Sequence, residues 1–92
     1  MKNESKKEKN LIQRNIELST EFSRYLFEHP DLESKLPADA EIVLLPEYDK
    51  ELRDYNIKTG IQMESEGQKV QYIRITNLRP KELSRIENVE LE

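Results

Sequence analysis

Two short apolar runs stand out in a chain whose other segments are rich in charged residues. The first, Ile42-Val-Leu-Leu45, is continuous rather than alternating, which is typical of a strand covered on both faces. The second, Val70-Gln-Tyr-Ile-Arg-Ile75, follows a stretch in which apolar residues from Leu52 to Met63 recur at helical spacing. Strand, helix and strand in this order predict a βαβ unit, in which the crossover makes the two strands parallel neighbours.

A longer amphipathic helix is predicted ahead of the first strand. Asn10 is its predicted N-cap, with Asn15 or an earlier polar residue as the alternative. The helix should end near His29, because Pro30 disfavours helical geometry in the residue before it. Its apolar residues form a broad stripe: Leu11, Ile12, Ile16, Leu18, Phe22, Tyr25 and Leu26.

Shorter elements connect and end these segments. Pro30 can open a short helix that runs through Leu36. Gly60 interrupts the second long helix at a cost of roughly 1 kcal/mol relative to Ala, which predicts local fraying. Gly67 is the predicted left-handed stop of that helix. After the second strand, Leu83 and Ile86 predict at most one further apolar turn.

The predicted fold class is therefore α/β, a small α-β-α-β unit around a parallel two-stranded βαβ core. A sheet of two strands leaves at least one edge unpaired. A symmetric dimer that joins two sheets, or that buries the open side of the first helix, would cover this surface. The alternative is that the C-terminal segment folds back over the edge, and we favour the dimer.

A length of 92 residues predicts one domain. Residues 1–10 contain nothing to bury and carry four Lys and two Glu, so they are predicted to be a disordered basic tail. The α/β domain is expected to span residues 11–79. Residues 80–92 are expected to form a C-terminal turn and tail, and the final Leu91-Glu92 has the form of a cloning remnant.

Charge and cysteine content narrow the class of function. The net charge is −4, and the basic residues of the body are scattered among carboxylates, which argues against a nucleic-acid partner. The chain has no cysteine, which excludes disulfides, thiol catalysis and thiolate metal sites. No run approaches the roughly eighteen apolar residues of a membrane span. The expected setting is the cytoplasm, with no membrane partner.

The first candidate site lies just beyond the carboxyl end of the first strand, where open α/β sheets commonly bind ligands. It consists of Glu47, Tyr48, Asp49 and Arg53. Its carboxylates could hold a hard cation, or one could act as a general base. We favour ordinary helix initiation, with Asp49 as the cap, because two acids supply too few ligands for a dedicated calcium or magnesium site.

No catalytic residue, metal site or cofactor is predicted. His29, the single histidine, has no second imidazole at ligand spacing and should instead contact carbonyls at the end of the first helix. The serines of that helix, Ser23 among them, have no base set beside them. Gly60 and Gly67 are the only glycines, so a Gly-rich phosphate loop is excluded. These observations do not favour an enzyme.

The first helix carries more apolar surface than a two-helix layer needs. Ile12 and Ile16 lie off the centre of its stripe, and Phe27 points away from Phe22 on a regular helix. A contact with a second copy or with a small partner protein would explain the excess. The alternative is that residues 30–40 and 78–89 wrap this side.

Two blocks are distinctive, Tyr25-Leu-Phe-Glu-His-Pro30 at the end of the first helix and Ile42-Val-Leu-Leu-Pro46 in the first strand. With two plainer blocks, Asn15-Ile-Glu-Leu-Ser19 and Tyr72-Ile-Arg-Ile75, they resemble a small prokaryotic family of uncharacterised proteins, catalogued as a domain of unknown function. The resemblance covers roughly residues 11–76 and implies a compact α/β fold without a known activity.

Together these observations predict a small protein that acts through protein contacts, as a non-catalytic interaction module and a homodimer. Ile12, Ile16 and Phe27 are its predicted interaction surface. The alternative function is a small-molecule or ion site, with or without catalysis, at the carboxyl end of the first strand.

Overall fold

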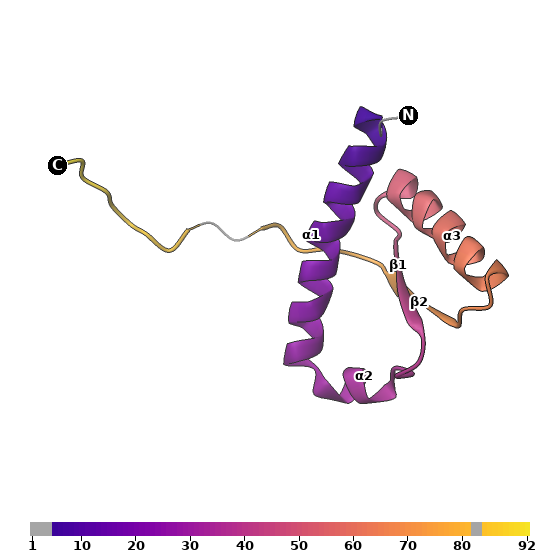
Figure 1. Cartoon of the computed structure of the whole chain (residues 1–92). Coiled ribbons are helices and arrows are strands. Elements are labelled where there is room, and N and C mark those ends of the chain that lie inside the picture. The colour runs from indigo at the N-terminus through magenta and orange to yellow at the C-terminus, as the bar shows by residue number, and fades with distance from the viewer. Residues whose placement is uncertain (1–4, 82–83) are drawn as a thin grey trace.

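The computed structural model describes residues 5–81 and 84–92, and within them the chain folds in the predicted order (Figure 1). The elements are α1 (Lys6–Glu28), α2 (Pro30–Lys35), β1 (Glu41–Pro46), α3 (Lys50–Ser65) and β2 (Val70–Ile75). β1 and β2 pair in parallel, with Leu44 opposite Ile73. This arrangement confirms the predicted α/β class and its βαβ core.

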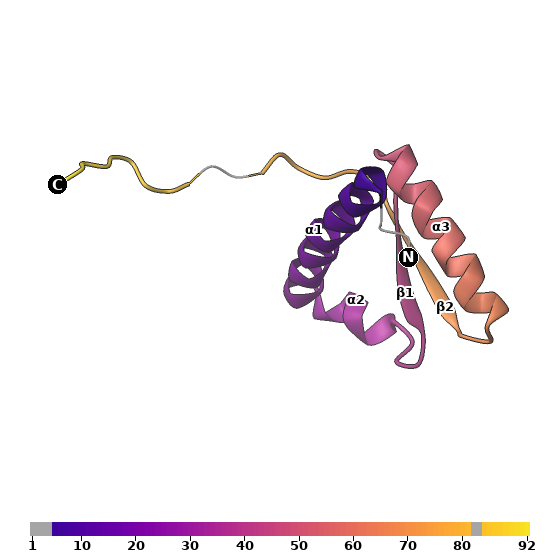
Figure 2. The ribbon, with the colours of Figure 1, turned by 45° about the horizontal axis from the view of Figure 1, so that its top comes forward.

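The two long helices lie on opposite sides of the small sheet, as Figures 1 and 2 both show. Leu11 and Leu18 of α1, Leu44 of β1 and Leu52 of α3 form one buried cluster. Partly buried side chains pack around this cluster: Phe22, Tyr55, Ile73 and Ile75. The core therefore joins all three layers, while the two outer edges of the sheet have no third strand in the described chain.

Helix α1 begins earlier than predicted. The N-cap is Ser5, whose hydroxyl accepts a hydrogen bond from the Glu8 N–H at 3.1 Å, rather than Asn10. Lys6 to Asn10 are therefore helical, which corrects this part of the expected disordered tail, and residues 1–4 lie outside the described residues. Ser5 and Glu8 form a Ser-x-x-Glu capping-box sequence, and this sequence starts the helix five residues before Asn10.

The predicted end of α1 is confirmed. Glu28 is its last residue, and Pro30 occupies the first position of α2. The His29 ring lies with Nδ1 2.8 Å from the carbonyl oxygen of Tyr25, and its ring stacks on the Tyr25 ring. The single histidine thus contacts the end of the helix, as its position predicts.

Helix α3 is continuous, so the predicted fraying at Gly60 is wrong. The Tyr72 ring from β2 lies directly against this glycine, and a Cβ at position 60 would stand 2.6 Å from the Tyr72 hydroxyl oxygen. That hydroxyl donates to Glu64 Oε1 at 2.9 Å. Gly60 is therefore explained by close packing, and Gly67, at φ 89°, ends the helix as predicted.

The segment after β2 leaves the folded body. Residues 76–81 and 84–92 form no helix or strand and are exposed throughout, and Figures 1 and 2 show the chain passing α1 and then extending away from the helices. Leu83, one of the two residues of the predicted apolar turn, lies outside the described residues. Ile86, the other, is 69% exposed. The described part of this segment therefore adds no apolar turn to the core.

Candidate functional site

The four predicted strand-end residues lie at the end of β1 and the start of α3, and the carboxylates of two of them, Asp49 and Glu47, are already engaged. Asp49 caps α3 by accepting the Leu52 N–H at 3.2 Å through Oδ1. Its other carboxylate oxygen accepts a hydrogen bond from Arg14 at 2.6 Å. Glu47 forms a 3.2 Å ion pair with Arg74. These contacts are those of a helix start, and a ligand site at this position remains a prediction.

The other two strand-end residues are less engaged, and the buried Nε of Arg53 makes no hydrogen bond within the described chain. Arg53 lies 3.9 Å from Asp54, and burial followed by the charge of Asp49 raises the pKa of Tyr48. Arg14 reaches across from α1 and also donates to Glu51. Sequence reasoning missed Arg14, because it is 35 residues away from Asp49 and no local pattern links the two.

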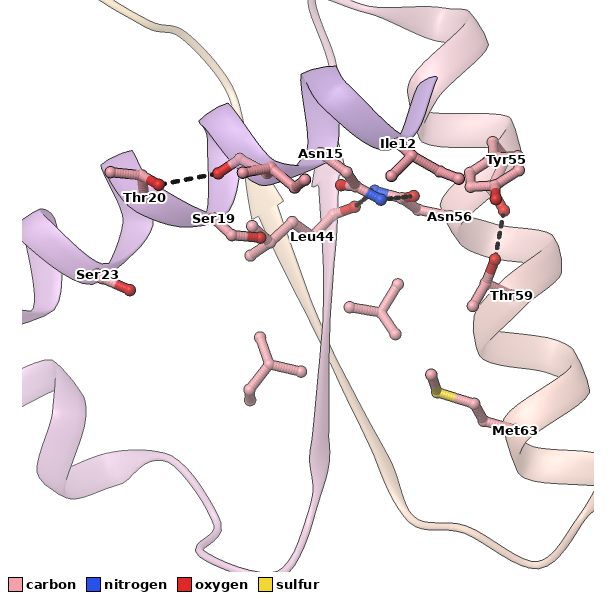
Figure 3. A pocket seen from close by; sticks show the side chains of 13 residues that line it. Ile12, Asn15, Ser19, Thr20, Ser23, Leu44, Tyr55, Asn56, Thr59 and Met63 are labelled. Atoms are coloured by element: carbon pink, nitrogen blue, oxygen red, sulfur yellow. Dashed lines mark hydrogen bonds between the residues drawn. The ribbon is translucent and has the colours of Figure 1, made fainter. Parts of the chain in front are cut away.

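A groove of about 530 Å³ lies between α1 and α3 and exposes the free edge of β1 (Figure 3). Its α1 wall includes Ile12 and Ile16, its floor is residues 42–44, and Met63 points into it from α3. None of its thirteen lining residues is charged, although charged residues make up 37% of the chain. The groove is therefore an uncharged strip on a highly charged protein.

One end of the groove is closed by a pair of amides. Asn15 of α1 and Asn56 of α3 donate to each other's side-chain oxygens at 2.8 and 3.0 Å, and Asn56 also donates to the Leu44 carbonyl at 2.8 Å. Asn56 is only 4% exposed, so its hydrogen bonds replace contacts with water. The pair joins the two helices across the β1 edge.

The remaining part of the β1 edge is open. The N–H groups of Glu41 and Glu47 bond to carbonyls on the β2 side, at Lys69 and Ile75. Because successive strand residues face opposite edges, the even-numbered residues of β1 face the groove. In the described chain β2 is the one strand paired with β1, so the even-numbered residues have no ladder partner, and no other hydrogen bond reaches the N–H or C=O of Ile42 or the N–H of Leu44.

The C-terminal part of the same edge is used internally. Leu44 offers its C=O to Asn56, Pro46 has no N–H, and the Pro46 C=O accepts from the Asp49 N–H at 3.2 Å. Three backbone groups in the first half of β1 are thus left without a hydrogen bond in the described chain. Sequence reasoning missed this feature, since which groups face outward depends on the pairing with β2.

The three predicted interaction residues are all exposed. Ile12 and Ile16 line the groove and are 37% and 54% exposed. Phe27, at 87%, does not line it, but at 100° per residue it falls on the same side of α1 as Ile16. The structure therefore places two of the three in the groove and the third on the stripe that continues beyond it.

A metal site and a membrane span each require features that the described residues lack. Within residues 5–81 and 84–92, no three His, Asp or Glu side chains gather as a metal-binding group would require. In the same part of the chain, no helix combines the length and apolar character that crossing a membrane needs.

Comparison with known proteins identifies a family for this chain but supplies no activity. A model of a family of unknown function (DUF5647) matches residues 10–89. No curated protein and no solved structure matches the chain. The matched region begins near the start of α1 and extends past β2 into the exposed C-terminal segment, so that segment is part of what the family model describes.

Proposed function

Because this chain belongs to the family of unknown function DUF5647, as its sequence predicts, and because membership supplies no activity, we propose a function from the geometry of the groove. The protein is a non-catalytic interaction module. Its groove receives an extended segment of a partner protein that carries apolar anchors and adds as a strand to the open half of the β1 edge. The proposed partner is a second copy or a small protein, and the proposed setting is the cytoplasm, supported by a chain without cysteine.

A single observation carries this proposal: unpaired backbone groups lie at the floor of an uncharged groove. An extended peptide that joins a sheet edge gains main-chain hydrogen bonds, while pockets on either side select its side chains. Here the N–H and C=O of Ile42 and the N–H of Leu44 are the available main-chain groups. Ile16 on one wall and Met63 on the other supply apolar contact.

The lining of the groove favours a protein segment over a charged small molecule. A phosphate or carboxylate ligand is usually held by Arg or Lys, and a hard cation by carboxylates, and the groove lining contains neither. Its hydroxyl groups, such as those of Ser19 and Ser23, have no base beside them, because the single histidine bonds at the end of α1. Binding without bond making is what this lining supports.

Selection of peptides against the full chain tests the proposal. Ile16→Lys places a charge in the groove, and Ile61→Lys is a matched control, since Ile16 and Ile61 are 54% and 56% exposed and Ile61 does not line the groove. Peptides selected from a random library should bind Ile16→Lys at least about tenfold more weakly and bind Ile61→Lys normally.

Amide NMR shifts should locate the bound peptide at residues 42–44. The proposal fails if no peptide binds, or if the selected peptides bind both variants equally well. Shifts that gather at residues 47–53 instead would support the predicted strand-end site. Fractionation of cells that express the chain tests the cytoplasmic setting, which recovery in a membrane or exported fraction would contradict.

A further inference from the structure

The C-terminal arm, defined here as residues 84–92, carries apolar side chains that touch nothing in their own domain. Ile86 and Val89 are 69% and 68% exposed. Single exposed apolar residues are common on protein surfaces, but these two lie on a segment with no helix or strand that the family model nevertheless covers up to residue 89. The apolar side chains of such a segment would be buried if it bound to a surface outside its own domain.

The shape of the groove restricts what can enter it. Asn15 and Asn56 bridge α1 and α3 across the β1 edge at Leu44. A second β1 strand, flanked by its own two helices, would collide with α1 and α3 at this bridge. A segment without flanking elements can approach from the open end near Ile42. The arm is such a segment.

We propose that the groove is filled by the arm of a second copy of this chain, so that two copies exchange arms in a symmetric dimer. This inference rests on the proposed function of the groove and names its partner. The groove lies at the β1 edge and is lined by no β2 residue, whereas the arm continues from β2, on the other edge of the sheet. A chain that filled its own groove would have to turn back around its body, and exchange avoids this turn.

The chemistry of the arm suits both walls. In an extended strand Ile86 and Val89 face opposite sides, because they are three positions apart and sides alternate at every position. One would meet Ile16 on α1 and the other Met63 on α3. The arm's backbone would pair with the free groups of Ile42 and Leu44.

One carboxylate of the arm can find hydroxyl donors on the α1 wall of the groove. Glu87 and Glu90 lie between and beyond the two apolar anchors in the sequence. Because Glu87 and Glu90 are also three positions apart, only one of them faces α1 in an extended strand. Ser19 and Ser23 point from α1 toward the groove, and their hydroxyls can donate to that carboxylate (Figure 3). A twofold exchange uses the same contact twice and closes without leaving a free groove.

Sedimentation of the full chain tests the exchange. The protein should be a dimer at micromolar concentration. The double variant Ile86→Asp/Val89→Asp should weaken the dimer at least about tenfold, because it removes both apolar anchors. Asn88→Ala changes the same arm without removing an anchor or adding a charge and should leave the dimer within about twofold of the original.

Engineered cysteines separate exchange from binding within one chain, because the natural chain has no cysteine. A mixture of Ile42→Cys chains and Val89→Cys chains should form a disulfide between copies under mild oxidation. A mixture of Ile61→Cys and Val89→Cys chains should not. One chain that carries both Ile42→Cys and Val89→Cys should give cross-linked dimers, and a cross-linked monomer would overturn the inference.

A monomer at all concentrations, or a dimer insensitive to the arm variants, would also overturn it. These failures remain distinct from failure of the proposed function. Ile86→Asp/Val89→Asp keeps an intact groove, so peptides selected against the original chain would still bind this variant if only the identity of the partner were wrong.

Discussion

The two halves of the β1 edge face the same pair of helices but differ in how their backbone groups are satisfied. Toward the C-terminal half, the Leu44 carbonyl accepts from Asn56, and Pro46 has no N–H to offer. Toward the N-terminal half, Ile42 leaves both its N–H and its C=O unpaired in the described chain. Natural edge strands are usually protected against pairing. Here the protection stops halfway, which is why we assign binding to the unprotected half.

Charged side chains are also distributed unevenly, between the C-terminal end of β1 and the groove. Beyond the C-terminal end of β1, Asp49 and Glu51 are held by Arg14, and Lys7 lies 3.2 Å from Glu51. Along the groove there is no charge at all. Asp49 and Glu51 thus connect α1 to α3, while the surface proposed to bind a partner consists of backbone groups and apolar walls.

The largest effect on stability should come from removing the amide that closes the groove. Asn56→Ala deprives the Leu44 carbonyl and the Asn15 amide of their partners in a buried place. We expect a loss of about 3 kcal/mol in the free energy of unfolding, since each buried polar group left unpaired costs about 1–3 kcal/mol. Urea denaturation followed by circular dichroism would measure it.

Asn15→Ala is the matched control for this change. It removes the amide pair but keeps the bond from Asn56 to the Leu44 carbonyl, so the expected loss is about 1 kcal/mol. Equal losses for the two variants would show that capping the strand edge contributes nothing. The contrast between the two halves of β1 would then have no energetic basis.

A smaller effect is expected on the far side of the sheet, where packing is tight instead of open. Gly60→Ala gains about 1 kcal/mol of helix propensity, but its Cβ would lie 2.6 Å from the Tyr72 hydroxyl and must displace the ring. Overpacking of this kind costs about 1–3 kcal/mol, so the net loss should be about 1 kcal/mol.

The effect of Gly60→Ala on the free energy of unfolding should change sign when the Tyr72 ring is removed. In a Tyr72→Val background, Gly60→Ala should stabilise the chain by up to about 1 kcal/mol, because only helix propensity remains. Thermal and urea denaturation of the four chains of this cycle would show the reversal. A loss of similar size in both backgrounds would mean that the ring is not what requires glycine.

Local rules predicted much of the fold. Periodicity placed α1, β1, α3 and β2 in order, Pro30 placed the end of α1, and Gly67 placed the end of α3. Each of these signals acts within one or two turns of the chain. Even the error at the start of α1 is local, because the capping-box sequence Ser5-x-x-Glu8 lies only five residues before the predicted cap Asn10.

The groove, in contrast, depends on contacts between distant residues. Asn56 is one polar residue in a helix, and only its position beside Leu44 and Asn15, 12 and 41 residues away, gives it a role. Gly60 needs Tyr72 to explain it in the same way. The predicted interaction residues Ile12 and Ile16 could be proposed from apolar excess alone, but the strand edge beside them could not, since pairing decides which groups face outward.

The smallest effect is expected at the exposed ion cluster. The hydrogen bonds from Arg14 and then from Lys7 lower the pKa of Glu51 below its ordinary value of 4.5. A carboxyl group with a lower pKa in the folded chain than in the unfolded chain adds stability above its unfolded pKa, and this stability is lost as pH falls through the folded pKa. Glu51→Gln should therefore be slightly less stable than the natural chain near neutral pH.

The difference between the two proteins should shrink below pH 4.5, where the carboxyl is increasingly protonated in both states, and also at high salt. Urea denaturation across this pH range, with exposed Glu17→Gln as the control, would measure it. A difference that did not change with pH would show that Glu51 acts through packing instead of charge.

Peptide binding in the groove should be unchanged in Glu51→Gln. If it weakened as much as in Ile16→Lys, the charged end of β1 and the open edge would have to be one functional unit.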